Sequence, residues 1–288
     1  MSTLTCCGRR FSHDDLSRIR TIIAAEDRPN RAEISRRVCR ELRWLRPDGR
    51  LKDMSCRVAL LRMHRSGLIR LPPPVKRNAN GRRGTKITPH TDPGSPVVAA
   101  AGVLPDLRLE RVEHKDDSLL WNEYVHRYHY LGYQPLSGAQ LRYFIASADR
   151  ILGVLGFGAA AWKTAPRDRW IGWTADQRKR NLHRVINNAR FLILPWVKSP
   201  NLASKILAMA ARNLPDDWEH AYSYRPVLIE TFVQKDRFAG TCYTAANWTY
   251  LGDTRGRGKL DTRHRNVVPV KAIFAYPLTP DFRSHLLH

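Results

Sequence analysis

Two histidines in the second half of the chain stand at a spacing that can bring imidazole groups together. His126 and His129 lie three residues apart near the end of a helix predicted over 119–130, so both side chains share one helical face. A metal site needs a third ligand that this spacing does not supply. We therefore predict no metal site here. A substrate pocket, a nucleic-acid stacking surface and a packing cluster stay open as alternatives.

Carboxylates and a tyrosine further along the chain suggest a different chemistry, cleavage of a nucleic-acid strand. Glu230, Asp236, Asp253 and Asp261 are candidates to hold Mg²⁺, and Tyr243 is a candidate to attack phosphate directly. The carboxylates show no recognisable nuclease spacing. The last two lie in an arginine-rich loop, where salt bridges are the simpler interpretation.

The elements that must position these groups alternate between strands and helices. Strands are predicted at 141–147 and 151–161, joined as a hairpin, and at 187–194, 225–233, 249–252 and 272–276. A loop at 196–201 leads into a helix at 202–213, and a short helix is predicted within 236–248. This order predicts an α+β domain with a mixed sheet flanked by helices.

The first third of the chain predicts a separate, helical domain. Apolar residues recur at helical spacing over 11–25, 32–45 and 54–66, and a short strand is predicted at 68–71. The third helix is expected to bury Val58 and Leu61. Three short helices and a strand are typical of a helix-turn-helix or winged-helix domain, whose third helix enters the major groove of DNA. A helical bundle with solvated arginines is the alternative.

The charge favours nucleic acid as the partner. The chain has 49 Lys and Arg against 26 Asp and Glu, a formal net charge of +23. The first 90 residues hold 22 of these cations and 8 of these anions, a net +14. Solubility alone needs a net charge of only about 2 to 8, so we expect double-stranded DNA to bind, with a flipped or single-stranded segment. The predicted DNA contacts are Lys52, Ser55, Arg57, Arg62, Arg36 and Arg40 in the first domain, and Lys163, Arg167, Arg169, Trp170, Arg255 and Arg257 in the second.

The pattern predicts a DNA-binding domain over 1–72, a flexible basic linker over 73–106 and an α/β domain over 107–288. No apolar run reaches about 18 residues, so no membrane span is expected, and no apolar segment typical of a signal peptide stands at the start. The five cysteines are odd in number and scattered, which predicts reduced thiols in the cytoplasm.

The order hairpin, strand, loop, helix, strand, short helix, strand resembles the GNAT acyltransferase fold, with 191–248 as its core. The resemblance implies that the phosphates of a CoA-like donor bind where helix 202–213 begins. The family's loop pattern, R/Q-x-x-G-x-G/A, reads Lys198-x-x-Asn201-x-Ala203 here, and Pro200 removes one amide donor. Asn tolerates the left-handed backbone that the family's glycine adopts. The implied cofactor-binding residues are Lys198, Asn201, Ala203 and Ser204.

The same resemblance implies a role for Tyr243. The family has a tyrosine followed, at the fourth and fifth positions, by Gly-Phe; here Tyr243 is followed by Asn247 and Trp248. In that family this tyrosine often donates a proton to the departing thiolate, so Tyr243 is the implied general acid.

Longer segments resemble the DruA family: 49–63, 128–133, 155–162, 187–197, 230–233 and 237–243. That family takes its name from a component of the Druantia anti-phage system and also occurs alone in mobile elements. The resemblance implies DNA-directed work in defence or transposition, with other proteins of such a system as partners. It implies no particular reaction.

Three hypotheses follow for the second domain. The first is a group transferase acting on DNA, with Tyr243 as acid and Glu230 or His129 as base. Its target base would leave the stack onto an aromatic platform, for which Trp162, Trp170 and Tyr130 are candidates. The second is metal- or tyrosine-dependent strand cleavage. The third is a non-catalytic DNA reader in a larger complex, which the altered positions Asn201 and Asn247 favour.

Overall fold

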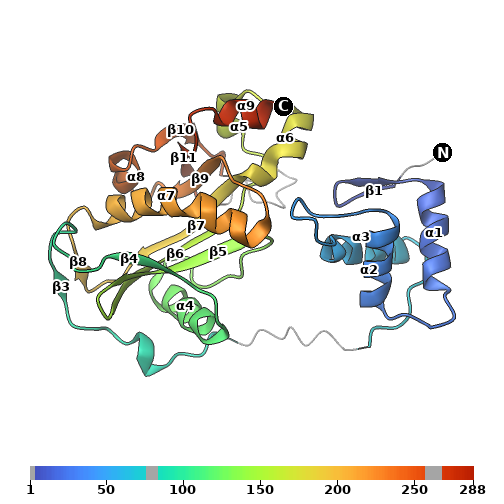
Figure 1. The fold of residues 1–288 in the computed structure, drawn as a ribbon, viewed down its shortest axis with the longest axis horizontal. Helices are drawn as coiled ribbons and strands as arrows, with labels where there is room; N and C mark the ends of the chain where they lie inside the picture. Colours follow the sequence, from blue (N-terminus) through green and yellow to red (C-terminus); the bar gives the residue numbers. More distant parts are fainter. Residues whose placement is uncertain (1–3, 76–83, 257–267) are drawn as a thin grey trace. The chain divides into compact units, whose positions relative to one another are not determined.

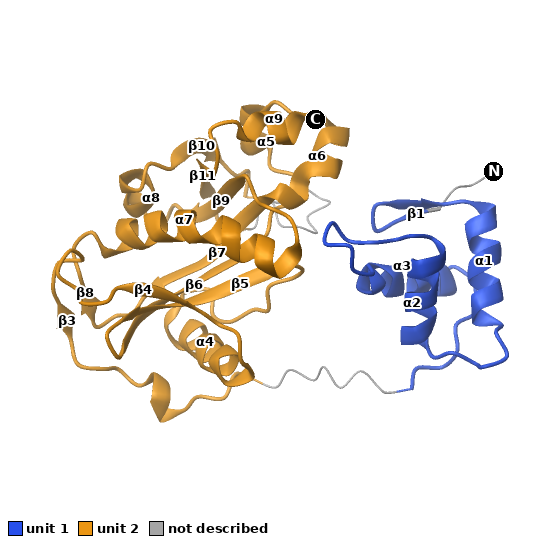
Figure 2. Cartoon of the chain, in the orientation of Figure 1, with its two compact units in different colours: residues 1–83 blue, residues 84–288 orange. Residues whose placement is uncertain are grey.

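The computed structural model describes residues 4–75, 84–256 and 268–288. The chain forms two compact units, Met1–Arg83 and Gly84–His288 (Figures 1 and 2). Each unit has its own apolar core, as two predicted domains require.

The first unit is built from three helices and a short hairpin. Its elements are β1 (Leu4–Cys6), β2 (Arg9–Phe11), α1 (His13–Ile23), α2 (Arg31–Glu41) and α3 (Asp53–Arg65). Ser12 caps α1 and Asn30 caps α2 by accepting hydrogen bonds from backbone amides of the first turn. The three predicted helices are confirmed, each with slightly shifted ends.

Two predictions for the first unit are wrong. Residues 68–71 form no strand; Ile69 and Leu71 instead bury their side chains as irregular chain against the helices. Val58 is 57% exposed, because α3 turns Cys56, Leu60 and neighbouring apolar groups toward the core instead. Two apolar stripes run along α3, and helical periodicity alone does not choose between them.

The second unit is a seven-stranded mixed sheet with helices packed against it (Figure 1). The strand order is β10-β11-β9-β7-β6-β5-β4, and every neighbouring pair is antiparallel except β7 and β9. The strands are β4 (Arg108–Arg111), β5 (Gln140–Ser147), β6 (Arg150–Ala159), β7 (Val185–Ile193), β9 (Leu228–Gln234), β10 (Thr249–Asp253) and β11 (Lys271–Pro277).

Among the described residues, the helices of the second unit are α4 (Lys115–Tyr128), α5 (Ala165–Ile171), α6 (Ala175–Asn181), α7 (Leu202–Tyr222), α8 (Thr241–Ala245) and α9 (Phe282–Leu287), with 3₁₀ turns η1 (Pro89–Thr91) and η2 (Leu182–Arg184). They include the helices predicted near 119–130, 202–213 and 236–248, together with α5 and α9, which were not predicted. Hairpin β5–β6, strand β7, a loop, helix α7, strand β9, short helix α8 and strand β10 confirm the expected succession. Trp121 of α4 and Trp218 of α7 are fully buried in the core.

The predicted linker over 73–106 is too long, because the second unit begins at Gly84. The buried Glu123 carboxylate of α4 accepts hydrogen bonds from Thr88 and Thr91. Further on, β3 (Val97–Val98) pairs in parallel with β8 (Val197–Lys198). The spacing of apolar residues does not reveal such hydrogen bonds or so short a strand pair, so the sequence did not predict that this segment is folded. Residues 76–83 of the predicted linker lie outside the described residues.

Candidate functional site

The central parallel strands of the second unit part from each other halfway along their length. β7 and β9 pair only from Val185 with Leu228 to Asn188 with Thr231, although both strands continue beyond that point. Where they part, the register between β7 and β6 shifts, so that Ala189 has no partner on β6. Such a bulge turns the strand locally and is common next to active sites. The resulting gap is the candidate site.

Tyr243 reaches the gap from α8. Its hydroxyl donates a hydrogen bond of 2.8 Å to Oδ1 of Asn188, and Oγ1 of Thr231 donates one of 3.1 Å to the Asn188 carbonyl. The Tyr243 ring stacks on Phe274 with 5.7 Å between ring centroids. Burial raises the pKa of Tyr243, so the phenol keeps its proton and acts as a donor.

The chain before Tyr243 is held tightly. Gly240, which precedes α8, has φ +76°, and a Cβ there would lie 2.8 Å from the ring of Phe274. A residue with a side chain is therefore excluded by both backbone strain and space. This fixes the approach of Tyr243 to Asn188.

The loop before α7 has features suited to an anion. Asn201 adopts the left-handed backbone expected for it, with φ 64°. Beside it, the hydroxyl of Ser199 is buried with no hydrogen-bond partner among the described residues. Amides in the first turn of a helix as long as α7 point outward and attract negative charge. Lys198 is exposed, and Ala203 and Ser204 are half-buried in that first turn, so all four predicted cofactor-binding residues lie together.

Part of the same loop is covered by the protein's own chain. The amide of Ala101 donates to the carbonyl of Pro200 at 3.1 Å, and Nζ of Lys205 donates to the Ala101 carbonyl at 2.9 Å. Trp196 packs edge-to-face on Tyr128, with 5.2 Å between centroids. The covering segment engages a carbonyl group of the loop. In the first turn of α7 the Leu202 amide donates to the Ser199 carbonyl at 3.2 Å, while the amides of Ala203 and Ser204 have no hydrogen-bond partner among the described residues.

Glu230 is fully buried in an ion pair, away from the role of a free base. Its Oε2 accepts from Arg167 at 2.9 Å and its Oε1 accepts from the Ala161 amide at 2.8 Å. Both Glu230 and Arg167 are 0% exposed. Burial raises the pKa of the Glu230 carboxyl, while the Arg167 guanidinium opposes that rise. The expected base at Glu230 and the expected DNA contact at Arg167 do not agree with this arrangement, because neither group is accessible.

The other predicted DNA contacts of the second unit lie at its surface. Lys163, Arg169 and Arg255 are exposed. Trp170 is half-buried, since its ring stacks on Phe282 with 5.0 Å between centroids. Arg257 lies outside the described residues.

His129 follows α4 and is held as a neutral imidazole. Burial, helped by the charge of Arg190, lowers the pKa of His129 to about 4. Its Nδ1 accepts a hydrogen bond of 3.2 Å from the Leu131 amide. A neutral ring whose Nδ1 accepts must carry its proton on Nε2. His129 thus presents a donor where the sequence predicted a base. His126 is exposed.

The carboxylates proposed for metal binding are scattered. Asp253 pairs with Lys235 at 2.5 Å and accepts from Tyr250, as the salt-bridge interpretation predicted. Asp236 is exposed and accepts from Gln234 at 3.3 Å. No group of three or more His, Cys, Asp or Glu side chains within 4–75, 84–256 and 268–288 is arranged to bind a metal ion. Asp261 lies outside these ranges.

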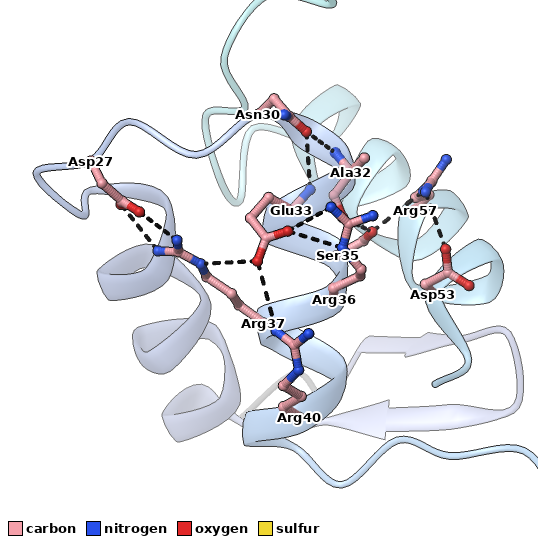
Figure 3. A network of polar contacts seen from close by, with 10 residues as sticks. All are labelled: Asp27, Asn30, Ala32, Glu33, Ser35, Arg36, Arg37, Arg40, Asp53 and Arg57. Atoms are coloured by element: carbon pink, nitrogen blue, oxygen red, sulfur yellow. Dashed lines mark hydrogen bonds and ion pairs between the residues drawn. The ribbon is translucent and has the colours of Figure 1, made fainter. Parts of the chain in front are cut away.

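In the first unit, carboxylates hold most of the predicted DNA-binding arginines (Figure 3). Glu33 accepts from Arg36 at 2.6 Å and lies 3.7 Å from Arg40. Asp53 pairs with Arg57 at 3.1 Å, whose Nε also faces Ser35. Arg62 is exposed and forms no ion pair within the described chain. Lys52 and Ser55 are half-buried at the start of α3.

Two residues central to the gap were not predicted from the sequence, Asn188 and Thr231. The signal was present in the first case. Asn187 and Asn188 are adjacent amides inside an otherwise apolar strand, which is unfavourable unless the amides have partners. Thr231 carried no such signal, because threonine is common in strands.

Comparisons with known proteins bear on the family and the fold. The sequence model of the family described as "Druantia protein DruA" matches residues 62–280. No curated protein matches the chain. Several solved structures are similar to this chain, including the three that follow. A probable GNAT-family acetyltransferase from Chromobacterium violaceum is 12% identical, with 72% of this chain and 97% of that chain covered and a TM-score of 0.38. The aminoglycoside acetyltransferase AAC(6')-Ib in complex with coenzyme A is 13% identical, with 62% of this chain and 98% of that chain covered and a TM-score of 0.38. FeeM, an N-acyl amino acid synthase from uncultured soil microbes, is 12% identical, with 63% of this chain and 96% of that chain covered and a TM-score of 0.38.

No helix of the described residues is long and apolar enough to cross a membrane. The five cysteines are free thiols.

Proposed function

The chain belongs to the DruA family of the Druantia anti-phage system, and from that premise we propose that it transfers a group from a CoA-like donor to DNA. One observation carries the proposal. The parted strands β7 and β9 hold a protonated phenol, Tyr243, against Asn188 at the point where the sheet opens. A donor fixed in a buried gap suits charge that develops on a leaving group.

The loop before α7 is the proposed donor site. Lys198, Asn201, Ala203 and Ser204 would hold the phosphates through first-turn amides and one lysine charge. A CoA-like thioester supplies an activated acyl group when bound. Tyr243 would then turn its hydroxyl from Asn188 to the departing sulfur and donate the proton.

The acceptor must lose a proton when it attacks, and Asp236 is the proposed group that receives it. Of the sequence-predicted bases, Glu230 has both carboxylate oxygens occupied and His129 presents an N–H. Asp236 is exposed, and Gln234 is its one hydrogen-bond partner among the described residues. General-base assistance of this kind typically contributes about 10²–10⁴-fold to the rate.

DNA is the proposed acceptor because both units carry exposed cations. In the first unit, Arg62 lies on the exposed side of α3 beside the uncovered apolar groups Met54 and Val58. A basic helix face with apolar groups suits phosphate contacts together with contacts to thymine methyl groups. In the second unit, Lys163 precedes α5 and Arg169 lies within it. Further basic residues follow in α6.

A non-catalytic DNA reader is the second candidate, and one observation favours it. The segment around Ala101 lies on the loop that would hold the donor, and Lys205 is tied to it by a hydrogen bond of 2.9 Å. If this segment does not move aside, the protein's own chain occupies part of the loop and a donor cannot bind there. Metal-dependent strand cleavage receives no support, since the described carboxylates form no metal-binding cluster.

The test is incubation of the pure protein with DNA and acetyl-CoA, with and without Mg²⁺, followed by gel electrophoresis and nucleoside mass analysis. Transfer predicts a new nucleoside mass that is absent with Tyr243→Phe and does not require Mg²⁺. DNA nicks that appear only with Mg²⁺ would rule out transfer in favour of cleavage. Bound DNA with unchanged nucleosides would instead support the reader.

A further inference from the structure

Two partly buried cations near the gap have no acidic partner among the residues that the structure describes. Arg190 stands on β7 just past the bulge, and its Nη1 donates to the Ala189 carbonyl at 2.7 Å. Its Nε is buried and has no hydrogen-bond partner among the described residues. Lys271 stands on β11, in register with Gln234 of β9. No described carboxylate pairs with either cation.

The positive charges of Arg190 and Lys271 repel each other, so binding of an anion at both would be favourable. Burial lowers the pKa of both Arg190 and Lys271, and the charge of Arg190 lowers that of Lys271 further. Like charges brought together out of water are unfavourable unless a third group neutralises them. Folding has nevertheless placed them on neighbouring parts of one sheet.

The face of the sheet that carries Arg190 is the one covered by α4. A Cβ at Gly156 would lie 3.5 Å from Cβ of Arg190 and 2.9 Å from the Trp121 ring of α4. The chain that follows α4 runs near Arg190. The positive charge of Arg190 adds to the lowering of the pKa of His129 by burial, and it opposes the rise that burial causes in the pKa of Tyr130.

Aromatic rings stand beside the cations. Tyr130 stacks on His129 with 4.8 Å between centroids and lies 5.3 Å from Phe238. The guanidinium of Arg237 lies 5.0 Å from the centre of the Tyr130 ring. Phe238 is 49% exposed, so part of this aromatic surface is open to a ligand. Planar bases stack on such surfaces with little dependence on their identity.

The remaining polar groups around the rings are a donor and one carboxylate. The protonated Nε2 of His129 points away from the Leu131 amide, which donates a hydrogen bond to Nδ1 of the same ring. Asp236, the acid that acts on the pKa of Tyr130, is exposed and bonded to Gln234. Within the described ranges, this single exposed carboxylate does not balance the charges of Arg190, Arg237 and Lys271.

We propose that His129, Tyr130, Arg190, Arg237, Phe238 and Lys271, the basic–aromatic cluster, bind one nucleotide of a DNA strand. Its phosphate would lie on Arg190 and Lys271, and its base against Tyr130 and Phe238. The two non-bridging oxygens of a phosphodiester can each accept from one of the two cations, and the exposed ring surface suits the base that the nucleotide carries. If the proposed function holds, this nucleotide is the acceptor, because Arg190 stands two residues along β7 from Asn188, which accepts the hydrogen bond from Tyr243.

Photo-crosslinking of the full-length protein to a short single-stranded DNA carrying 5-iodouracil tests the site. The expected crosslink, mapped by mass spectrometry, is to Tyr130 or Phe238. A charge-assisted contact contributes about 1.5–3 kcal/mol, so Arg190→Gln and Lys271→Met should each weaken DNA capture at these residues by about tenfold or more. Arg212→Gln, which removes an exposed arginine of α7, should leave the crosslink unchanged.

Thermal unfolding of the same variants separates binding from folding. Loss of a desolvated cation without a partner should leave the unfolding temperature unchanged or raise it. An unchanged crosslink yield in Lys271→Met, or a crosslink that maps elsewhere, overturns the proposal. A crosslink that coenzyme A abolishes, with Lys271→Met weakening coenzyme A binding instead, assigns the phosphate to the donor and also overturns it. The crosslink does not depend on any transferred group, so it can succeed where nucleoside mass analysis finds no transfer.

Discussion

Replacement of Arg167 by methionine is the sharpest test of how the second unit is held together. The Arg167 guanidinium links Glu230 of β9 to Asp168 of α5, at 2.9 and 2.8 Å, and also donates to the Ala161 carbonyl. Methionine keeps the length of the side chain and removes the charge. Glu230 is then left as a buried carboxylate with the Ala161 amide as its remaining donor.

The expected loss of stability follows from that isolated charge. Breaking a buried ion pair by removing one partner costs about 3–5 kcal/mol, because the other charge stays uncompensated. For a unit of about 200 residues, each kcal/mol lowers the unfolding temperature by about 2–4 °C. Arg167→Met should therefore lower the unfolding temperature by about 6–20 °C.

The assay is thermal and denaturant unfolding followed by tryptophan fluorescence. Trp173 reports on the region directly, because its indole donates to Asp168 at 3.0 Å. The matched control is Arg225→Met, which breaks a pair with Asp216 at 2.6 Å. Half of the Arg225 side chain is exposed, and surface pairs of this kind contribute about 0–1 kcal/mol.

The double variant Arg167→Met with Glu230→Met should recover part of the loss, because no lone charge remains. A loss for Arg167→Met no larger than for the Arg225 control would refute the reasoning. So would a variant that folds with full stability but binds DNA at least about tenfold more weakly, since Arg167 would then contact DNA as the sequence first predicted.

Three further outcomes follow from the structure. Tyr243→Phe should reduce group transfer by about 100-fold or more with DNA affinity unchanged; equal transfer rates would remove the phenol from the chemistry. The lowered pKa of His129, about 4 against 6.5 unfolded, means that the unfolded chain binds the extra proton between these values. Stability should therefore fall as pH drops from about 6.5 toward 4, by at most about 1.4 kcal/mol per pH unit, and His129→Gln should flatten that slope in unfolding experiments. For DNA binding, Arg62→Ala should reduce the slope of log affinity against log salt by about 0.9, whereas Arg36→Ala, already paired with Glu33, should change it less; equal slopes in titrations of both variants would contradict this.

The order of elements in the second unit was predictable because its strands and helices carry their own periodicity. The apolar run at 187–194 and the helical spacing from Leu202 need no distant partner to be read. The left-handed backbone at Asn201 was expected from the resemblance to the family's loop, where Asn stands at the position of a glycine and tolerates that backbone.

Contacts between distant charged residues were not predictable in the same way. Glu230 and Arg167 are 63 positions apart, and each is usually an exposed residue type. A sequence gives the residue type but not the pairing, so Arg167 was predicted as a surface cation. The three threonine hydrogen bonds to Glu123 escaped prediction for the same reason.

The arginines of the first unit show how such pairing changes the positive charge that is available to a ligand. From composition, Arg36, Arg40 and Arg62 are equivalent sources of positive charge. In the structure the first two share Glu33, and the third has no described ion-pair partner. A phosphate that binds Arg36 must compete with a carboxylate that is already 2.6 Å away, whereas a phosphate at Arg62 gains the whole interaction.

If the first unit binds DNA as proposed, that difference gives α2 and α3 separate tasks. Exposed pairs contribute only about 0.2–1 kcal/mol, so the arginines of α2 can exchange Glu33 for phosphate at little cost and with little gain. In the proposed DNA complex such residues would orient the duplex without adding much affinity. Arg62, which has no ion-pair partner among the described residues, lies on the helix that also exposes the apolar side chains of Met54 and Val58. Discrimination between DNA sequences, if the first unit provides any, must therefore come from α3.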